Sequence, residues 1–257
     1  MDRVDRPLLR ADGEGVAVLT LNRPKQSNAL SSSLLCALHG ELDAIARDAA
    51  VRVVVIAGSG EAFCAGHDLR ELRRHAEAGE VARLFRTCSD LMLKIVRLPQ
   101  PVIAEVNGIA TAAGCQLVAQ CDLAVGSERA TFAVSGINLG LFCSTPAVAV
   151  SRAMPRKRAA EMLFTGDVIN ARQALEWGLL NRVVPAAKLR RATMRLAATL
   201  CTKPRDVLAL GKALFYRQLE TGLEAAYVDA SETMARNTLL PAAIEGIEAF
   251  IGKRHRA

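Results

Sequence analysis

Two stretches of small residues could together form a site for a developing negative charge. Residues 58–72 read G-S-G-E-A-F-C-A-G-H-D-L-R-E-L, and residues 107–116 read N-G-I-A-T-A-A-G-C-Q. Each stretch runs from an apolar strand pattern into a helix pattern. Small residues let a ligand approach the backbone, and the first N–H groups of a helix have no internal partner and point outward at the positive end of its dipole. Two such helix starts that face one another would stabilise an oxyanion.

Side chains near these stretches could take part in catalysis. His67 has a reference pKa of about 6.5, so it is a candidate base, although its ring could also line the site while only its backbone N–H takes part. Three cysteines could act as nucleophiles beside it, namely Cys64, Cys115 and Cys143. Buried, inert cysteines are the commoner alternative, because nothing in the sequence marks a lowered thiol pKa.

Motifs for metals and common cofactors do not accompany these residues. The G-S-G at residues 58–60 lacks the third glycine of a dinucleotide fingerprint, and the sequence contains no P-loop and no Gly-x-Ser-x-Gly elbow. The histidines fall at no metal-ligand spacing, and they are His39, His67, His75 and His255. The seven cysteines are odd in number and scattered, which argues against disulfides and a zinc site. We expect neither a metal nor a bound cofactor.

Strand and helix patterns surround both stretches. Short β-branched and apolar runs predict strands at residues 16–21, 51–56, 102–106, 123–125 and 131–134. Serines at 31–33 offer an N-cap, and helical spacing of apolar residues predicts helices at residues 34–46, 84–96 and 111–120. After Pro185 only helical patterns follow, at residues 189–200, 207–219, 223–234 and 243–250. We expect an α/β unit and a helical C-terminal segment that packs on it or on another subunit.

Charge and hydropathy limit the partners of the chain. The 257 residues carry a net charge of +7, from 33 basic and 26 acidic residues, which favours an anionic partner unless the charge only keeps the protein soluble. Nucleic acid, an acidic membrane surface and a phosphorylated ligand all qualify. No apolar run approaches the roughly 20 residues of a membrane span. Residues 1–10 lack the apolar core of a secretory signal, so we expect a cytoplasmic protein.

Several motifs resemble those of one enzyme superfamily. A-F-C-A-G-H-D-L (residues 62–69) resembles the crotonase motif A-F-x-A-G-x-D-L/I, and residues 107–116 resemble its N-G-x-A-x-G-G-G-C-E. Supporting matches are N-R-P-K-Q-S-N-A-L at 22–30, C-D-L-A-V at 121–125 and the segment 163–185. By these motifs, in the family's order, the chain is identified as a member of the crotonase (enoyl-CoA hydratase/isomerase) superfamily. G-L-F-C-S-T-P at 140–146 resembles the branch called enoyl-CoA hydratase domain-containing protein 3.

The resemblance implies a fold and a ligand. The fold is a crotonase-like (ClpP/crotonase) spiral of ββα repeats over residues 1–195, followed by a helical trimerisation region over residues 196–257. The ligand is an acyl-CoA thioester, and the assembly is a homotrimer or a dimer of trimers. A specific nucleic-acid partner is not expected, because only 4% of the residues are aromatic and stacking motifs are lacking.

The resemblance also implies the roles of particular residues. The thioester oxygen is held by the backbone N–H groups of His67 and Ala113, as an oxyanion hole. The positions that line CoA in the family are occupied here by Lys25, Gln26, Ala29, Ala65, His67, Asp68, Leu69, Arg70 and Ala113. For residues 68–70, turn and helix-start chemistry after Gly66 is the structural alternative.

The chain departs from the family at both catalytic glutamates. Gln116 stands at the first glutamate position and Gly136 at the second. Glutamine does not titrate and glycine has no side chain, so neither can act as general acid or base. Ordinary hydration of enoyl-CoA should therefore be severely impaired, and a non-catalytic acyl-CoA-binding or regulatory protein is the alternative. If the pocket is otherwise that of a hydratase, glutamate at both positions should restore hydration.

Overall fold

A six-stranded sheet forms the centre of the molecule. The computed structural model describes residues 6–74 and 78–254, so His75 and His255 lie outside the described residues. The strand order is β1-β2-β3-β4-β6-β9, and only the β1–β2 pair is antiparallel. The strands are β1 (Leu8–Gly13), β2 (Val16–Leu21), β3 (Val53–Gly58), β4 (Val102–Val106), β6 (Leu123–Ser127) and β9 (Arg182–Val184).

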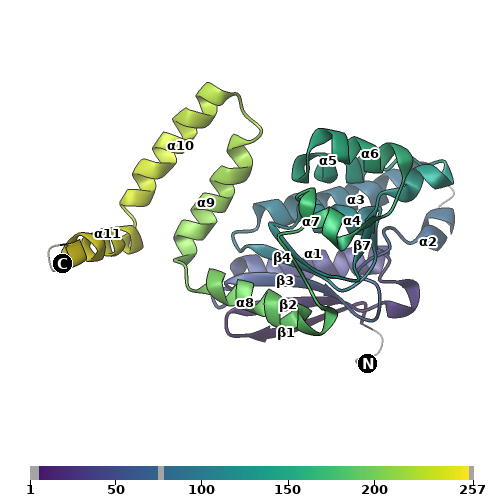
Figure 1. The fold of residues 1–257 in the computed structure, drawn as a ribbon, viewed down its shortest axis with the longest axis horizontal. Coiled ribbons are helices and arrows are strands. Elements are labelled where there is room, and N and C mark those ends of the chain that lie inside the picture. The colour runs from purple at the N-terminus through teal and green to yellow at the C-terminus, as the bar shows by residue number, and fades with distance from the viewer. Residues whose placement is uncertain (1–5, 75–77, 255–257) are drawn as a thin grey trace.

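Helices cover both faces of this sheet (Figure 1). One face packs against α1 (Ser32–Arg47), α3 (Ala78–Arg97) and α4 (Ala113–Gln120), and the opposite face packs against α8 (Leu189–Cys201). Val54 and Ile56 of β3 face the first set of helices, whereas Val53 and Val55 face α8. The continuous apolar run of β3 is explained by this burial on both faces.

A smaller layer of structure lies beside α4. Strands β5 (Ala110–Thr111), β7 (Thr131–Ala133) and β8 (Ile169–Asn170) form a three-stranded sheet. The rest of this layer consists of η3 (Ser135–Leu139), α5 (Ser144–Ala153), α6 (Arg156–Thr165) and α7 (Ala171–Glu176). The short elements that remain are η2 (Pro24–Gln26), α2 (Leu69–Arg74) and η4 (Ala186–Lys188).

The predicted elements agree with the structure where the sequence signal is strong. The expected strands at 16–21 and 102–106 coincide with β2 and β4. The expected N-cap is confirmed, since the Ser31 hydroxyl accepts a hydrogen bond from the N–H of Leu34 at 3.3 Å. Strand β1 and helices α5 to α7 were not predicted from the sequence. Within the described residues, every helix is too short or too polar to cross a membrane.

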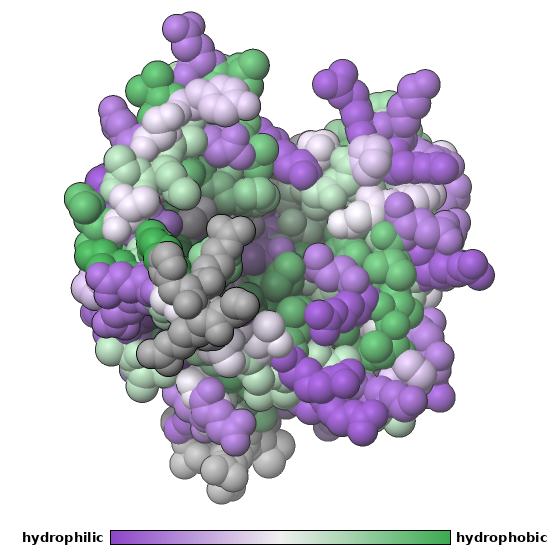
Figure 2. Space-filling view, turned by 60° about the vertical axis from the view of Figure 1, so that its left-hand side comes forward, coloured by the Kyte–Doolittle hydropathy of each residue, from purple (hydrophilic) through white to green (hydrophobic). Residues whose placement is uncertain are grey.

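Three C-terminal helices form an arm that stands away from the sheet (Figure 1). They are α9 (Arg205–Gln218), α10 (Leu223–Thr238) and α11 (Pro241–Arg254). Apolar surface alternates with charged side chains on the face seen in Figure 2. The boundary expected between residues 195 and 196 falls inside α8, whose Leu196 and Ala197 still pack against the sheet. The division into a core and an oligomerisation region stays a prediction.

A buried polar joint connects the arm to the body. The Lys212 ammonium of α9 lies 2.6 Å from an Asp122 carboxylate oxygen and donates to the carbonyl oxygens of Ile95 and Gln100, at 2.9 and 3.0 Å. The Tyr216 hydroxyl donates to the other Asp122 oxygen at 2.8 Å. Burial lowers the pKa of Lys212, although the Asp122 charge opposes that shift. This joint ties α9 to the chain segment that directly follows α4.

Candidate functional site

Backbone hydrogen bonds join three segments that are distant in sequence, namely 24–30, 63–70 and 109–116. The N–H of Leu30 donates to the Gly66 carbonyl at 2.7 Å, and the N–H of Asp68 donates to the Leu30 carbonyl at 3.2 Å. On the other side, the N–H of Thr111 donates to the Cys64 carbonyl at 3.0 Å. The two stretches that the sequence singled out therefore lie side by side.

Two glycines make this close approach possible. A Cβ atom at Gly114 would lie 2.0 Å from the Cys64 carbonyl oxygen, so no side chain fits there. A Cβ atom at Gly66 would lie 3.2 Å from the Ala113 nitrogen, and Gly66 also has a φ of +89°. Glycine tolerates both the close contact and the positive φ, because it has no Cβ atom. As a result, the backbone of residue 67 lies next to the start of α4.

The N–H groups of His67 and Ala113 are both free to bind a ligand. Across residues 6–74 and 78–254, no protein group accepts a hydrogen bond from either of them. Ala113 is the first residue of α4, so its N–H has no partner within the helix and lies at the positive end of the helix dipole. Two unpaired donors on adjacent segments are what a developing oxyanion requires.

The residue before Ala113 has a strained backbone. Ala112 has φ 49° and ψ −118°, a conformation that residues with a Cβ atom rarely adopt. Its own N–H donates to the Ala133 carbonyl of β7 at 2.9 Å, which holds the chain in this turn. Strain of this kind costs on the order of 1–3 kcal/mol and persists only when surrounding structure imposes it. The turn directs the N–H of Ala113 out of the helix end.

His67 is a neutral side chain in this environment. Its ring packs edge-on against Phe85 with centroids 4.9 Å apart, and its Nε2 atom is buried without a partner among the described residues. Burial lowers the pKa of His67 to about 4, against the opposing charge of Glu71. The imidazole is therefore uncharged at pH 7 and only weakly basic. Its role as a base stays a prediction, and the packing favours the alternative that the ring lines the site.

Gln116 lies one turn into α4, on the same side of the helix as Ala113. Its side chain is buried, with the residue 3% exposed. The Oε1 atom has no hydrogen-bond partner among the described residues. An amide oxygen accepts hydrogen bonds but cannot donate or titrate. The position thus presents a neutral amide, which both accepts and donates hydrogen bonds, where the family motif has a carboxylate.

Gly136 lies in η3, and the space beside its Cα is already filled. A Cβ atom there would lie 2.5 Å from the Leu141 carbonyl oxygen and 2.7 Å from the Cys143 sulfur. The N–H of Gly136 donates to that sulfur at 3.3 Å. The φ of Gly136 is not in the left-handed region, so packing, and not backbone conformation, prevents a larger side chain at this position. A glutamate at position 136 therefore requires residues 141–143 to shift, and the restoration of hydration by two glutamates stays a prediction.

The cysteines around the site are buried, which favours inert thiols over nucleophiles. Burial raises the pKa of Cys64 and of Cys115 to about 12. Burial also raises the pKa of Cys143, although its hydrogen bond from Gly136 opposes the shift. All three sulfurs are protonated at pH 7, and a thiol is a much weaker nucleophile than a thiolate.

The positions expected to line CoA gather near one edge of the site. Lys25 and Gln26 are exposed on η2, Leu69 and Arg70 are exposed at the start of α2, Ala29 is buried, and Ala65 is half-buried. They lie together because residues 27–30 bond to residues 65–68: the N–H of Ala65 donates to the Ser27 carbonyl at 2.9 Å. This edge exposes two cations, Lys25 and Arg70, which suit an anionic ligand.

Asp68 has a structural role that the sequence indicated only in part. Its carboxylate pairs with the Arg23 guanidinium at 2.9 Å and accepts a hydrogen bond from the N–H of Arg70 at 3.1 Å. Burial would raise the pKa of Asp68, but the Arg23 guanidinium and the backbone N–H groups hold it below its usual value. Arg23 was missed as a site residue, although it lies in the N-R-P-K motif.

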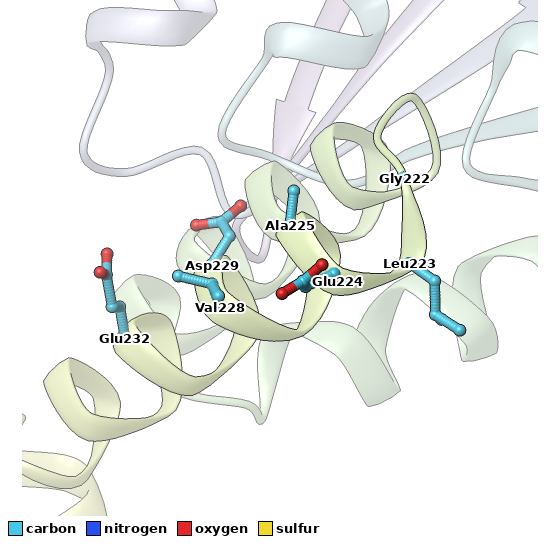
Figure 3. Close-up of a pocket in the computed structure, with 7 residues that line it drawn as sticks. All are labelled: Gly222, Leu223, Glu224, Ala225, Val228, Asp229 and Glu232. Carbon is cyan, nitrogen blue, oxygen red and sulfur yellow. The ribbon is translucent and has the colours of Figure 1, made fainter.

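Two surface hollows lie away from these residues. The larger, of about 680 Å³, runs beside the first turns of α10 and carries the carboxylates of Glu224, Asp229 and Glu232 (Figure 3). Negative charge there would repel the phosphates of CoA. The other, of about 290 Å³, lies between α6 and α7 and includes Met162 and Trp177. Within residues 6–74 and 78–254, no group of three or more His, Cys, Asp or Glu side chains is placed to hold a metal ion.

Replacing Ala112 with glycine should stabilise the protein. Ala112→Gly removes the Cβ atom that makes this turn unfavourable, so the free energy of unfolding should rise by about 1 kcal/mol. Ala119→Gly, within the same helix at an ordinary helical position, should lower it by about 0.5–1 kcal/mol. Denaturant titration at equal protein concentration measures both, and equal destabilisation by the two changes would contradict strain at residue 112.

Known proteins resemble this chain over nearly its whole length. The sequence profile described as "Enoyl-CoA hydratase/isomerase" matches residues 11–257. Enoyl-CoA hydratase domain-containing protein 3, mitochondrial, of Mus musculus is 48% identical over 241 residues, covering 94% of this chain and 80% of that protein. The 2,3-dehydroadipyl-CoA hydratase of Escherichia coli is 33% identical and covers 93% of both chains.

Solved structures give the same result. The human enoyl-CoA hydratase domain-containing protein 3 superposes with a TM-score of 0.93 at 47% identity, covering 96% of this chain and 98% of that chain. An enoyl-CoA hydratase of Mycobacterium smegmatis superposes with a TM-score of 0.94 at 54% identity, covering 96% of each chain. The expected crotonase-like α/β fold and the resemblance to the domain-containing protein 3 branch are confirmed. The chain belongs to the enoyl-CoA hydratase/isomerase family.

Proposed function

We propose that this protein binds an acyl-CoA thioester and polarises its carbonyl group between the N–H groups of His67 and Ala113. The observation that carries the proposal is that both N–H groups are unpaired and lie on segments held together at Gly66. Donors fixed where charge develops stabilise an enolate, and the loss of one such donor typically costs about 10²–10³ in rate. The reaction class is that of an enoyl-CoA hydratase or isomerase.

The anionic part of CoA is expected at the edge that contains η2 and the start of α2. Lys25 and Arg70 are exposed there, and the CoA-lining positions of the family fall on the same segments. The Arg23–Asp68 ion pair fixes these segments against each other, since it joins residues 45 positions apart in sequence. Asp68 thus acts as a positioning residue for the CoA edge.

Ordinary hydration of enoyl-CoA is expected to be slow, because Gln116 and Gly136 replace the family's acid and base. Each such group typically contributes about 10²–10⁴ in rate. The second candidate function is therefore an acyl-CoA-binding or regulatory protein without turnover, which the neutral state of His67 favours. Turnover of a panel of enoyl-CoA esters, set beside their dissociation constants, distinguishes the two.

Ala113→Pro should weaken acyl-CoA binding. Proline is tolerated at the first position of a helix, where it removes an N–H that has no partner in the helix. Losing the hydrogen bond to the thioester oxygen should raise the dissociation constant of butyryl-CoA by about tenfold or more. Ala113→Gly keeps the N–H and should bind as the parent does. Calorimetric titration of variants with parental circular dichroism tests this, and equal affinities would refute the assigned donor.

Adding glutamates back should not restore hydration in a single step. Gly136→Ala alone should lower the free energy of unfolding by about 1–3 kcal/mol, because its Cβ atom meets the Leu141 carbonyl. Gly211→Ala is the control, since a Cβ atom on α9 meets nothing within 4 Å. We expect the Gln116→Glu, Gly136→Glu double variant to hydrate crotonyl-CoA no faster than Gln116→Glu alone. A stable double variant with a large gain would show that residues 140–143 can move.

We also propose that the arm forms the contacts of a homotrimer or a dimer of trimers. Large apolar side chains are exposed along it, including Phe215, Leu219, Leu223, Tyr227, Leu239 and Phe250. Exposed apolar area of this extent is typical of a subunit interface. Light scattering of the full chain should give about three or six times its mass of 27.5 kDa. A monomeric mass at micromolar concentration would contradict this proposal.

The cellular location stays a prediction. The names of the domain-containing protein 3 relatives include the word mitochondrial, which differs from the cytoplasmic location that we expect for this chain. We also predict that the protein has no bound cofactor and no specific nucleic-acid partner, and both stay predictions. Imaging of the tagged full chain in its own cells would decide its location.

A further inference from the structure

A loop at residues 59–62 leads from β3 toward the proposed thioester site, and side-chain amides from outside the loop hold it. Nδ2 of Asn28 donates to the carbonyls of Ser59 and Ala62, at 2.9 and 2.8 Å. Nδ2 of Asn107 donates to a third carbonyl of the loop at 2.7 Å. The loop itself is neither strand nor helix. Its path therefore depends on these amides as well as on the strand that precedes it.

Asn28 has an environment that suits this role. The residue is fully buried, at 0% exposure. Its Oδ1 atom accepts a hydrogen bond from the N–H of Arg23 at 2.8 Å, so both polar atoms of the amide are paired. Its φ is +54°, and asparagine adopts this left-handed conformation more readily than most residues. A buried amide whose hydrogen bonds are all made holds its partners in one arrangement.

The segment that contains Asn28 also forms the edge where CoA is expected. Helix η2 lies directly before it in the chain. Directly after it, the N–H of Leu30 donates to the Gly66 carbonyl at 2.7 Å, one residue before His67. Asn28 thus lies between the CoA edge and the segment that supplies the first of the two free N–H groups.

We propose that Asn28 is a positioning residue that fixes the His67 N–H in the direction of the thioester oxygen. It acts through the loop at residues 59–62, whose end sets where residues 63–67 begin. Without the two amide donations, carbonyl groups of the loop would lose their partners, which is unfavourable in a protein interior. The loop would then move and carry the His67 N–H with it. This inference rests on the proposed function, namely that this N–H binds the thioester oxygen.

Asn28→Asp tests the role, because aspartate has nearly the same shape and keeps the acceptor for the N–H of Arg23. When ionised it donates no hydrogen bond, and when protonated it donates one. A buried carboxyl group that faces carbonyl oxygens has a raised pKa, so we expect it to be ionised at pH 8 and largely protonated at pH 5.5. Calorimetric titration of the full chain with butyryl-CoA should give a dissociation constant about tenfold or more above that of the parent at pH 8, but within about threefold of it at pH 5.5.

The other titratable groups around residue 28 should not produce the same change. The charged side chains on segments 23–30, 59–68 and 107–111 are Arg23, Lys25, Glu61 and Asp68. The reference pKa values of these residue types lie outside the range from 5.5 to 8. His67, with its pKa lowered to about 4, is uncharged at both pH values, and Cys64, with its pKa raised to about 12, is protonated at both. The recovery at pH 5.5, taken relative to the parent, therefore reports on residue 28.

Two further variants make the test specific. Asn22→Asp is the matched control, since Nδ2 of Asn22 donates to the Arg6 carbonyl at 3.0 Å, away from the loop. It should bind butyryl-CoA as the parent does at both pH values. Asn28→Gly accommodates the positive φ and removes the amide, so it should bind about tenfold more weakly at both pH values. It also serves as the test if aspartate prevents folding at pH 8.

The outcomes separate this inference from the proposed function. Parental affinity at pH 8 of a residue 28 variant with parental circular dichroism would overturn the role of Asn28. An aspartate variant that binds equally weakly at pH 8 and pH 5.5 would overturn it as well, because donation to the loop would then not determine binding. Failure of butyryl-CoA to bind the parent would instead overturn the proposed function itself.

Discussion

The contact between residues 64–66 and residues 111–114 is the constraint on which the site depends. The two segments follow β3 and β4, which are neighbouring parallel strands, so both leave the sheet at the same edge. Ligands of open α/β sheets commonly bind at the carboxyl ends of strands. Here the ends approach so closely that Gly114 has no room for a side chain beside the Cys64 carbonyl oxygen. Without that contact, the N–H groups of His67 and Ala113 would not lie next to each other.

The surroundings of those two N–H groups are almost without charge. His67 is neutral, Gln116 does not titrate, and the thiols of Cys115 and Cys143 stay protonated. Fixed dipoles act more strongly when water and mobile charge are excluded. The arrangement suits the binding and polarisation of a carbonyl group better than the transfer of protons. Charge is found instead at the edge of the site, where Arg23 pairs with Asp68 and Lys25 is exposed.

The sequence predicted the backbone of the site better than its side chains. Strands β2 and β4, the N-cap at Ser31 and the two small-residue stretches follow from local periodicity and capping, which need no tertiary information. The family motif added the pairing of His67 with Ala113. The contacts of Gly136 could not be predicted, because they involve Leu141 and Cys143 in a loop whose path depends on α5. The strain at Ala112 could not be predicted either, since alanine is usually a helix former and the positive φ depends on the tertiary hydrogen bond to Ala133.

The packing around Gly136 also bears on how the site can change over generations. Because the Leu141 carbonyl and the Cys143 sulfur occupy the volume beside residue 136, a single substitution there meets a collision before it can bring any benefit. A larger residue at position 136 becomes accessible only after the loop at residues 141–143 has been rebuilt, by changes that bring no advantage on their own. The glycine at position 136 is then held in place by epistasis with residues 141–143, and selection acts on the rest of the site.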